Sequence, residues 1–212
     1  MTRVVYLHGF ASGPGSRKAR YFRDLLTPRG FDVEIPDLAE GRFSELTITG
    51  QLDVVARACR EKSVVLIGSS LGGYLAALYA ARHPAVERVV LLAPAFSFAT
   101  HWAETLGDER MKEWQATGRL SVFHYAENAQ RDLGWRFMVD ARQYEETPDF
   151  RQPGLIFHGS KDEVVPVAFS ERFAREHENA RLRVLDSGHE LTDVLETMGA
   201  ETSRFLDIYR GL

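Results

Sequence analysis

The stretch VVLIGSSLGGYLAALYAARHP, residues 64–84, joins an apolar run to an alanine-rich helical pattern through a serine flanked by glycines. Its segment GSSLG, residues 68–72, matches G-x-S-x-G with Ser70 at the centre. A strand before this motif and a helix after it are the setting of a nucleophile elbow, which exposes the serine hydroxyl on a sharp turn. Strand and helix approach closely there, so Gly68 and Gly72 lack side chains. The stretch predicts Ser70 as a nucleophile; a glycine-rich turn without chemistry is the alternative.

Short apolar runs alternate with helical patterns along the rest of the chain. Several runs are continuous hydrophobics, typical of strands that helices cover on both faces of a parallel sheet. The predicted strands are residues 4–7, 31–38, 63–68, 86–95, 154–159 and 180–186, and the predicted helices are residues 16–30, 46–60, 71–84, 167–178 and 191–210. The alternation predicts one α/β domain over residues 1–212. We expect a doubly wound, mainly parallel sheet of about six strands with helices on both faces.

Residues 96–148 interrupt this alternation, and we find no convincing strand in them. The segment holds all three tryptophans of the chain. We expect a helical cap above the sheet that also supplies an apolar wall of a substrate pocket. Ordinary helix packing, which needs aromatic residues as well, is the simpler interpretation. The predicted pocket residues are Phe96, Phe98, Trp102 and Trp135.

A serine nucleophile needs a base, and the base needs a carboxylate that orients it. On a sheet of this kind the order along the chain is serine, acid, histidine, each in a loop after a strand. Asp162 follows the run 154–159 and His189 follows the run 180–186. Both therefore lie at carboxyl ends of predicted strands, where sites in such sheets form. We predict Ser70, Asp162 and His189 as a catalytic triad.

Other residues could in principle fill these roles. Glu163 is the alternative acid, although side chains one residue apart usually point differently. Asp186 is interpreted as a residue that shapes the turn before His189. His158, at the end of a predicted strand, is interpreted as a structural loop residue. Four further histidines lie outside the expected loops: His83, His101, His124 and His177.

An oxyanion hole requires two N–H donors aimed at the developing alkoxide. Leu71, directly after the nucleophile, is predicted to supply one of them. The loop of residues 6–16 begins with His8-Gly9 after the first strand, so Phe10 is the predicted second donor. The alternative is that this loop only makes a tight turn.

Composition limits the other function classes. The 212 residues carry a formal net charge of −4 and no dense Lys/Arg block, so nucleic-acid binding is not expected. Cys59 is the one cysteine, which excludes an intramolecular disulfide and zinc sites built on cysteine pairs. No apolar run is long enough to span a bilayer, and no signal peptide opens the chain. These features predict a soluble cytoplasmic protein and leave its oligomeric state open.

The motifs resemble the α/β-hydrolase superfamily over essentially the whole chain, because four of them occur in the family order: LHGF (7–10), GSSLGG (68–73), HGSKDEVVP (158–166) and SGHE (187–190). More closely, YLHGFASGPGSRKAR (6–20) with IGSSLGGY (67–74) is similar to small bacterial esterases of the YqiA type. The resemblance implies hydrolysis of a small-molecule ester by the predicted triad and backbone donors, without a metal or an organic cofactor. The tryptophan-bearing insertion matches nothing that would identify the substrate.

The sequence thus predicts a serine hydrolase that cleaves carboxylic esters through an acyl-enzyme on Ser70. A thioesterase for acyl-CoA or S-acyl substrates would use the same residues, so the sequence does not separate the two. A non-catalytic protein that binds a ligand in an apolar cleft is the alternative from another class. The intact order of the predicted triad argues against it.

Overall fold

A computed structural model describes residues 2–60 and 63–207. Six strands form one parallel sheet in the order β2-β1-β3-β4-β7-β8. The predicted doubly wound sheet is therefore confirmed, and each strand lies at a predicted position. The strands are β1 (Thr2–Leu7), β2 (Phe31–Glu34), β3 (Val64–Ser69), β4 (Val86–Leu92), β7 (Gly154–Gly159) and β8 (Ala180–Leu185).

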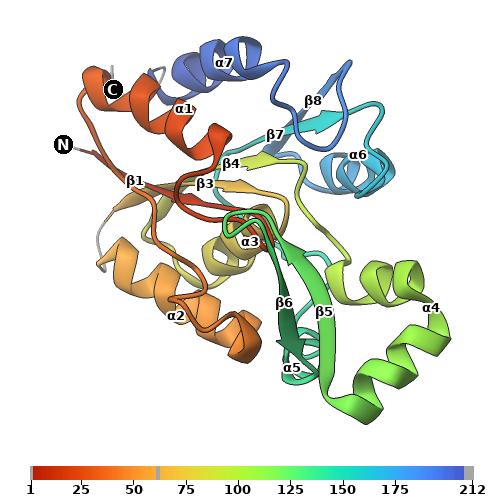
Figure 1. Cartoon of the computed structure of the whole chain (residues 1–212). Helices are drawn as coiled ribbons and strands as arrows, with labels where there is room; N and C mark the ends of the chain where they lie inside the picture. The colour runs from red at the N-terminus through yellow and green to blue at the C-terminus, as the bar shows by residue number, and fades with distance from the viewer. Residues whose placement is uncertain (1, 61–62, 208–212) are drawn as a thin grey trace.

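Helices cover both faces of this sheet (Figure 1). One face carries α1 (Arg17–Leu26) and α7 (Leu195–Asp207), and the other carries α2 (Ile48–Cys59), α3 (Leu71–Arg82) and α6 (Val167–Glu176). Residues 208–210 of the predicted last helix lie outside the described residues. Among the helices in the described part, none has the length and apolar character to cross a membrane.

The two hydrophobic cores follow from the alternation of side chains along the strands. Val65 and Ile67 of β3 pack on the side of α1 and α7, whereas Val64 and Leu66 pack on the side of α2 and α3. Both faces of β3 are buried, which explains why its sequence is continuously apolar.

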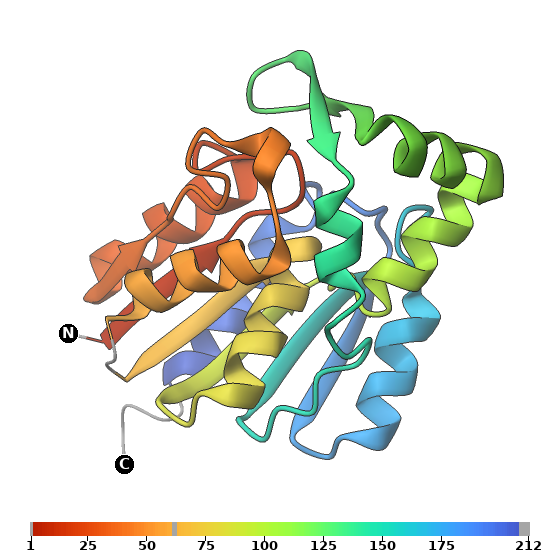
Figure 2. The ribbon, with the colours of Figure 1, turned by 90° about the horizontal axis from the view of Figure 1, so that it is seen from below.

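Residues 96–148 contain two strands as well as helices, so the expectation that this segment holds no strand is wrong. The segment holds α4 (Phe98–Thr117), β5 (Arg119–His124), β6 (Ala129–Gly134) and α5 (Arg136–Ala141), and β5 and β6 pair as an antiparallel hairpin. In β6 only Leu133 is buried, so this strand lacks the apolar alternation by which sequence patterns reveal strands. Figure 2 shows α4 and the hairpin projecting from one end of the sheet.

Candidate active site

Ser70 lies on the sharp turn between β3 and α3, with φ 53° and ψ −119°. Such a conformation is strained for a non-glycine residue and persists only where the surroundings hold it. The Ser70 N–H donates to Leu92 O of β4 at 2.8 Å, which ties the turn to the sheet. A Cβ on Gly72 would lie 2.2 Å from Leu7 O, and one on Gly68 would lie 2.2 Å from Gly72 O. Close backbone approach thus requires both glycines, as the motif indicated.

The structure brings the three residues of the predicted triad into one hydrogen-bonded chain. His189 Nδ1 lies 2.8 Å from Asp162 Oδ2, and His189 Nε2 lies 3.1 Å from Ser70 Oγ. An ionised carboxylate only accepts hydrogen bonds, so the proton of the neutral imidazole is on Nδ1. Nε2 is then free to accept from the Ser70 hydroxyl. Glu163, the alternative acid, is exposed.

Asp162 is held by more than its contact with His189. Its Oδ1 accepts the backbone N–H groups of Val164 at 2.9 Å and Val165 at 2.8 Å, and its side chain is fully buried. Burial by itself raises the pKa of Asp162, but hydrogen bonds from His158, His189 and Val165 outweigh that effect and hold the pKa well below its usual range. The carboxylate is therefore charged at neutral pH.

A close approach of two loops places Asp162 beside His189. A Cβ on Gly159, at the end of β7, would lie 2.3 Å from Ser187 O in the loop before His189. Lys161 N–H donates to the same Ser187 O at 2.9 Å, and its ammonium pairs with Asp186 at 2.6 Å. Sequence reasoning did not single out Gly159, although a glycine at a strand end is a signal of such an approach.

The loop with the predicted oxyanion donors reaches the nucleophile. A Cβ on Gly9 would lie 3.5 Å from Ser70 Cβ, so the backbone before Phe10 is in contact with Ser70. Leu71 is the first residue of α3, and its N–H therefore has no acceptor within the helix. The loop is braced from the cap, because Tyr125 N–H at the hairpin tip donates to Ala11 O at 2.7 Å.

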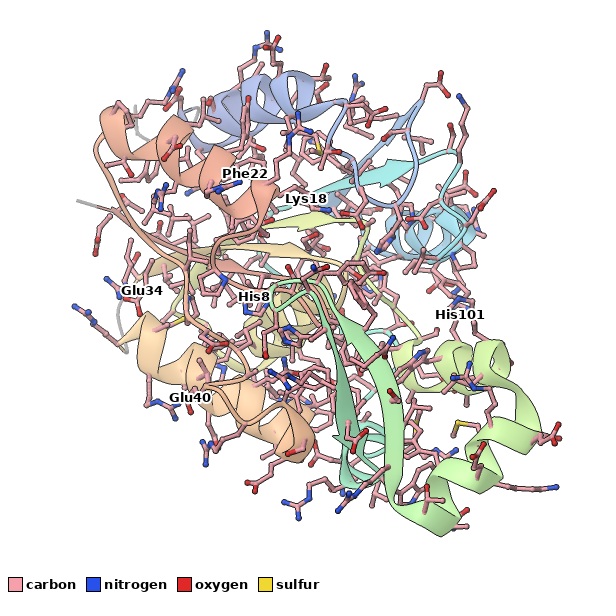
Figure 3. The ribbon with its side chains drawn as sticks, viewed as in Figure 1. His8, Lys18, Phe22, Glu34, Glu40 and His101 are labelled. Carbon is pink, nitrogen blue, oxygen red and sulfur yellow. The ribbon has the colours of Figure 1, made fainter. Side chains whose placement is uncertain are left out.

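His8 braces the other side of this loop. Its ring is buried, its Nε2 accepts the N–H of Leu38 at 3.2 Å, and its Nδ1 lies 3.0 Å from Gly9 O (Figure 3). Burial lowers the pKa of His8, which keeps the imidazole neutral and able to accept at Nε2. Sequence reasoning treated His8 only as part of a turn, because its partner Leu38 is distant along the chain.

The predicted pocket residues separate into two groups. Phe98 and Trp102 lie together, with ring centroids 5.3 Å apart, and Trp102 also contacts the ring of Phe10 at 5.2 Å. Both are partly buried, and Trp102 lies against the loop that contains Phe10. Phe96 is different: it is 1% exposed and stacks on Phe173 of α6 at 4.7 Å. Its ring therefore packs in the core, contrary to the expected pocket position.

Trp135 also lies away from the group around Phe10. It contacts Trp114 edge-on at 5.2 Å and lines a separate hollow of about 500 Å³ near the base of the hairpin. The hollow has no residue of the predicted triad in its lining, which consists of Ser44, Gly118, Arg119, Asp132, Gly134, Trp135 and Arg136. The expected place of Trp135 in the wall of a substrate pocket therefore stays a prediction.

A model of the family described as Uncharacterised protein family (UPF0227) matches residues 3–203. The chain belongs to the UPF0227 family. No curated protein sequence matches it.

Solved structures place this UPF0227 member among proteins with the α/β-hydrolase fold. Est1E from Butyrivibrio proteoclasticus with bound ferulic acid is 20% identical with a TM-score of 0.84, over 100% of this chain and 90% of that chain. Mouse alpha/beta hydrolase domain-containing protein 10 is 20% identical with a TM-score of 0.82, over 97% and 89%. A putative hydrolase from Agrobacterium vitis is 22% identical with a TM-score of 0.83, over 96% and 87%. The superfamily that the motifs resemble is thus confirmed for the fold.

Sequence reasoning missed a lysine that this UPF0227 member places next to the loop of His189. Lys18 points inward from α1 (Figure 3), and only 9% of its side chain is exposed. Its ammonium donates to Glu190 O at 2.7 Å, next to His189. Burial lowers the pKa of Lys18, although Glu190 and Asp162 oppose the shift. The lysine therefore ties α1 to the loop that contains His189.

No group of three or more His, Cys, Asp or Glu residues that could hold a metal ion occurs among residues 2–60 and 63–207. The buried polar groups around Ser70 instead bond to one another. The arrangement offers a hydroxyl, an imidazole and a carboxylate in sequence, together with free N–H groups at a helix start. These are the parts that acyl transfer through a serine requires.

Proposed function

We propose that this protein is a serine hydrolase that cleaves carboxylic esters through an acyl-enzyme on Ser70. The observation that carries the proposal is the hydrogen-bonded chain from Ser70 Oγ through His189 to Asp162. It lies on a strand–turn–helix elbow, next to the N–H of Leu71. Neither a metal nor an organic cofactor takes part in this chemistry.

In the first half of the reaction, Ser70 Oγ attacks the ester carbonyl while His189 Nε2 takes its proton. Asp162 keeps the imidazole in the required tautomer and stabilises the imidazolium that forms. The carbonyl oxygen becomes an alkoxide, which the N–H groups of Leu71 and Phe10 stabilise. His189 then gives the proton to the departing alcohol, and the acyl group stays on Ser70.

In the second half, water takes the place of the alcohol. His189 removes a proton from the water as its oxygen attacks the acyl carbonyl, and the same N–H groups stabilise the second alkoxide. The proton returns to Ser70 Oγ as the carboxylic acid leaves. The start of α3 favours negative charge at this position in both halves, because its first N–H groups point toward the site.

The partly exposed rings near the oxyanion loop indicate a small-molecule ester with an apolar acyl or alcohol group. Phe98 and Trp102 offer an apolar surface beside Phe10. Apolar burial of such a group provides binding free energy that depends on its length. The preferred length is therefore a measurable property of the site.

The direct test is hydrolysis of p-nitrophenyl esters from acetate to palmitate. We expect turnover with a clear preference for one chain length, and covalent labelling by a fluorophosphonate probe on the peptide that contains Ser70. Mass spectrometry of the labelled peptide locates the adduct. A folded protein that neither turns over any ester nor reacts with the probe would contradict the proposal and favour a ligand-binding protein on this fold.

A thioesterase would use the same residues in the same roles. Comparing kcat/KM on oxygen and sulfur esters with identical acyl groups separates the two activities. We expect the oxygen ester to be hydrolysed at a rate that matches or exceeds that of the thioester. A large preference for the thioester would change the assignment to acyl-CoA or S-acyl substrates, with Ser70 still the nucleophile.

The single thiol provides an independent check on the identity of the nucleophile. Cys59 is 1% exposed, and burial raises the pKa of its thiol to about 11. Because the thiolate is the reactive form, we expect a thiol reagent to label the folded protein slowly and to leave ester hydrolysis intact. Thiol titration with DTNB, before and after addition of denaturant, measures this. Rapid labelling that also stops hydrolysis would contradict a serine mechanism.

A further inference from the structure

His158 is a fully buried histidine with a polar partner on each ring nitrogen. It lies in β7, and its Nδ1 is 2.8 Å from Ser170 Oγ of α6. Its Nε2 is 2.9 Å from Val165 O and 3.2 Å from Asp162 Oδ2. His158 lies at the end of β7 as expected, but it is a strand residue and not a loop residue, and its ring contacts the predicted triad acid.

The partners of His158 determine where its proton is. Val165 O and Asp162 Oδ2 can only accept hydrogen bonds, so an unprotonated Nε2 would face two acceptors in a buried site. Nε2 therefore carries hydrogen and shares it between both oxygens, with the shorter contact to Val165 O. The Ser170 hydroxyl can donate to Nδ1, which satisfies the other side of the ring.

His158 acts on Asp162 by two routes. The first is the direct contact between Nε2–H and Oδ2, the same oxygen that accepts from His189. The second runs through the turn, since His158 fixes the carbonyl of Val165 and the N–H of Val165 donates to Asp162 Oδ1 at 2.8 Å. Both routes restrict rotation of the carboxylate, and the direct one also withdraws charge from Oδ2.

We propose that His158 is a positioning residue of the active site, which fixes the orientation of the Asp162 carboxylate toward His189. The inference rests on the proposed function, because Asp162 matters for rate only if His189 is the base. His158 itself touches neither the substrate nor the nucleophile. Its contribution to the reaction is therefore indirect and runs entirely through Asp162.

Other charged groups also surround this part of the site. Lys18 from α1 acts on Asp162 through its charge, and Glu190 lies 3.8 Å from the Lys18 ammonium. His101 from α4 contacts the turn that follows Asp162, because its Nε2 lies 3.0 Å from Val164 O. The variants below keep all three residues, so a change in pH dependence reports on His158.

The decisive comparison is between His158→Phe and His158→Gln. Phenylalanine removes the donor, so we expect kcat to fall about 10- to 100-fold with little change in KM, which corresponds to the loss of a hydrogen bond to a charged group. Oδ2 then holds more charge toward His189, and the acid limb of the kcat/KM profile should move to higher pH. Glutamine can place an N–H where Nε2 was, and it should restore much of kcat and the wild-type profile.

A core variant on α6 separates positioning from general loss of packing. Phe173→Leu removes buried volume near Ser170 without removing a contact to Asp162, so it should lower stability but leave the pH profile unchanged. If His158→Phe folds and keeps both the wild-type kcat and the wild-type profile, the positioning role is excluded. The same conclusion holds if Phe173→Leu shifts the profile equally.

A measurement on the unmodified protein remains decisive even if His158→Phe does not fold. Nitrogen-15 NMR of histidine-labelled protein reports which ring nitrogen carries hydrogen, and the spectrum of His158→Gln assigns the signal. Hydrogen on Nε2 is expected, and an unprotonated Nε2 overturns the proposal. This readout needs no activity. Failure of the proposed function would instead appear as wild-type protein without Ser70-dependent ester turnover, whatever the state of His158.

Discussion

Ser70→Ala is expected to lower kcat for ester hydrolysis by ~10⁴-fold or more, in a protein that folds as the wild type does. In the proposed mechanism the hydroxyl forms the acyl-enzyme, and in the structure it lies 3.1 Å from His189 Nε2. Alanine retains the Cβ and the same backbone at φ 53°, so the elbow keeps its shape. The residual rate would come from the N–H donors and from binding alone.

The neighbouring serine is the matched control. Ser69 is the last residue of β3, is 3% exposed and has no contact with His189, so Ser69→Ala should retain most of the wild-type kcat. Stopped-flow and steady-state assays with a p-nitrophenyl ester measure both variants. Adding His189→Ala to Ser70→Ala should cost little more, because the two residues act as a unit. Turnover by Ser70→Ala close to that of Ser69→Ala would remove Ser70 from the mechanism.

Gly72→Ala is expected to destabilise the protein by more than about 3 kcal/mol, and the variant should be largely insoluble on expression. The added Cβ would lie 2.2 Å from Leu7 O and 2.5 Å from His8 O. Both atoms belong to the backbone at the end of β1, which is hydrogen-bonded to β3 and cannot move aside as a flexible side chain would. The loop with the predicted oxyanion donors starts at this same point, so any fraction that folds should also lose activity.

The control is Gly15, a glycine with space around it in the loop between β1 and α1. A Cβ on Gly15 meets nothing within 4 Å, so Gly15→Ala should leave the free energy of unfolding nearly unchanged. Urea unfolding followed by circular dichroism measures the difference between the variants. A Gly72→Ala protein as stable as Gly15→Ala would show that the elbow and β1 do not pack as closely as described.

Local sequence patterns determined the sheet and the elbow. Strands such as β3 and β7 are buried on both faces, so a short run of apolar residues is sufficient to identify them. The G-x-S-x-G motif constrains the chain over only five residues, and its glycines are required by contacts that every strand–turn–helix of this kind makes. Ser70, Asp162 and His189 could be predicted as one group because each lies in the turn or loop that follows a strand.

Strand pairing in the cap and contacts between residues far apart in the sequence became clear only from the tertiary structure. The β5–β6 hairpin was missed because β6 gains its stability from hydrogen bonds to β5 while most of its side chains stay exposed. Aromatic residues of the cap look alike in sequence, yet Phe96 packs on α6 and Trp102 packs beside Phe10. Only the fold decides which ring faces which neighbour.

The buried polar contacts around the predicted triad show the same division. Sequence placed Asp162 and His189 at strand ends, because that rule is local. The sequence did not reveal that His158 contacts Asp162. It also did not reveal that Lys18 bonds to Glu190, which is 172 residues away in the loop of His189. A buried polar side chain needs a hydrogen-bond partner, but the amino-acid sequence does not say which residue that partner is. The partner is chosen when the strands and helices pack, and that choice completes the site.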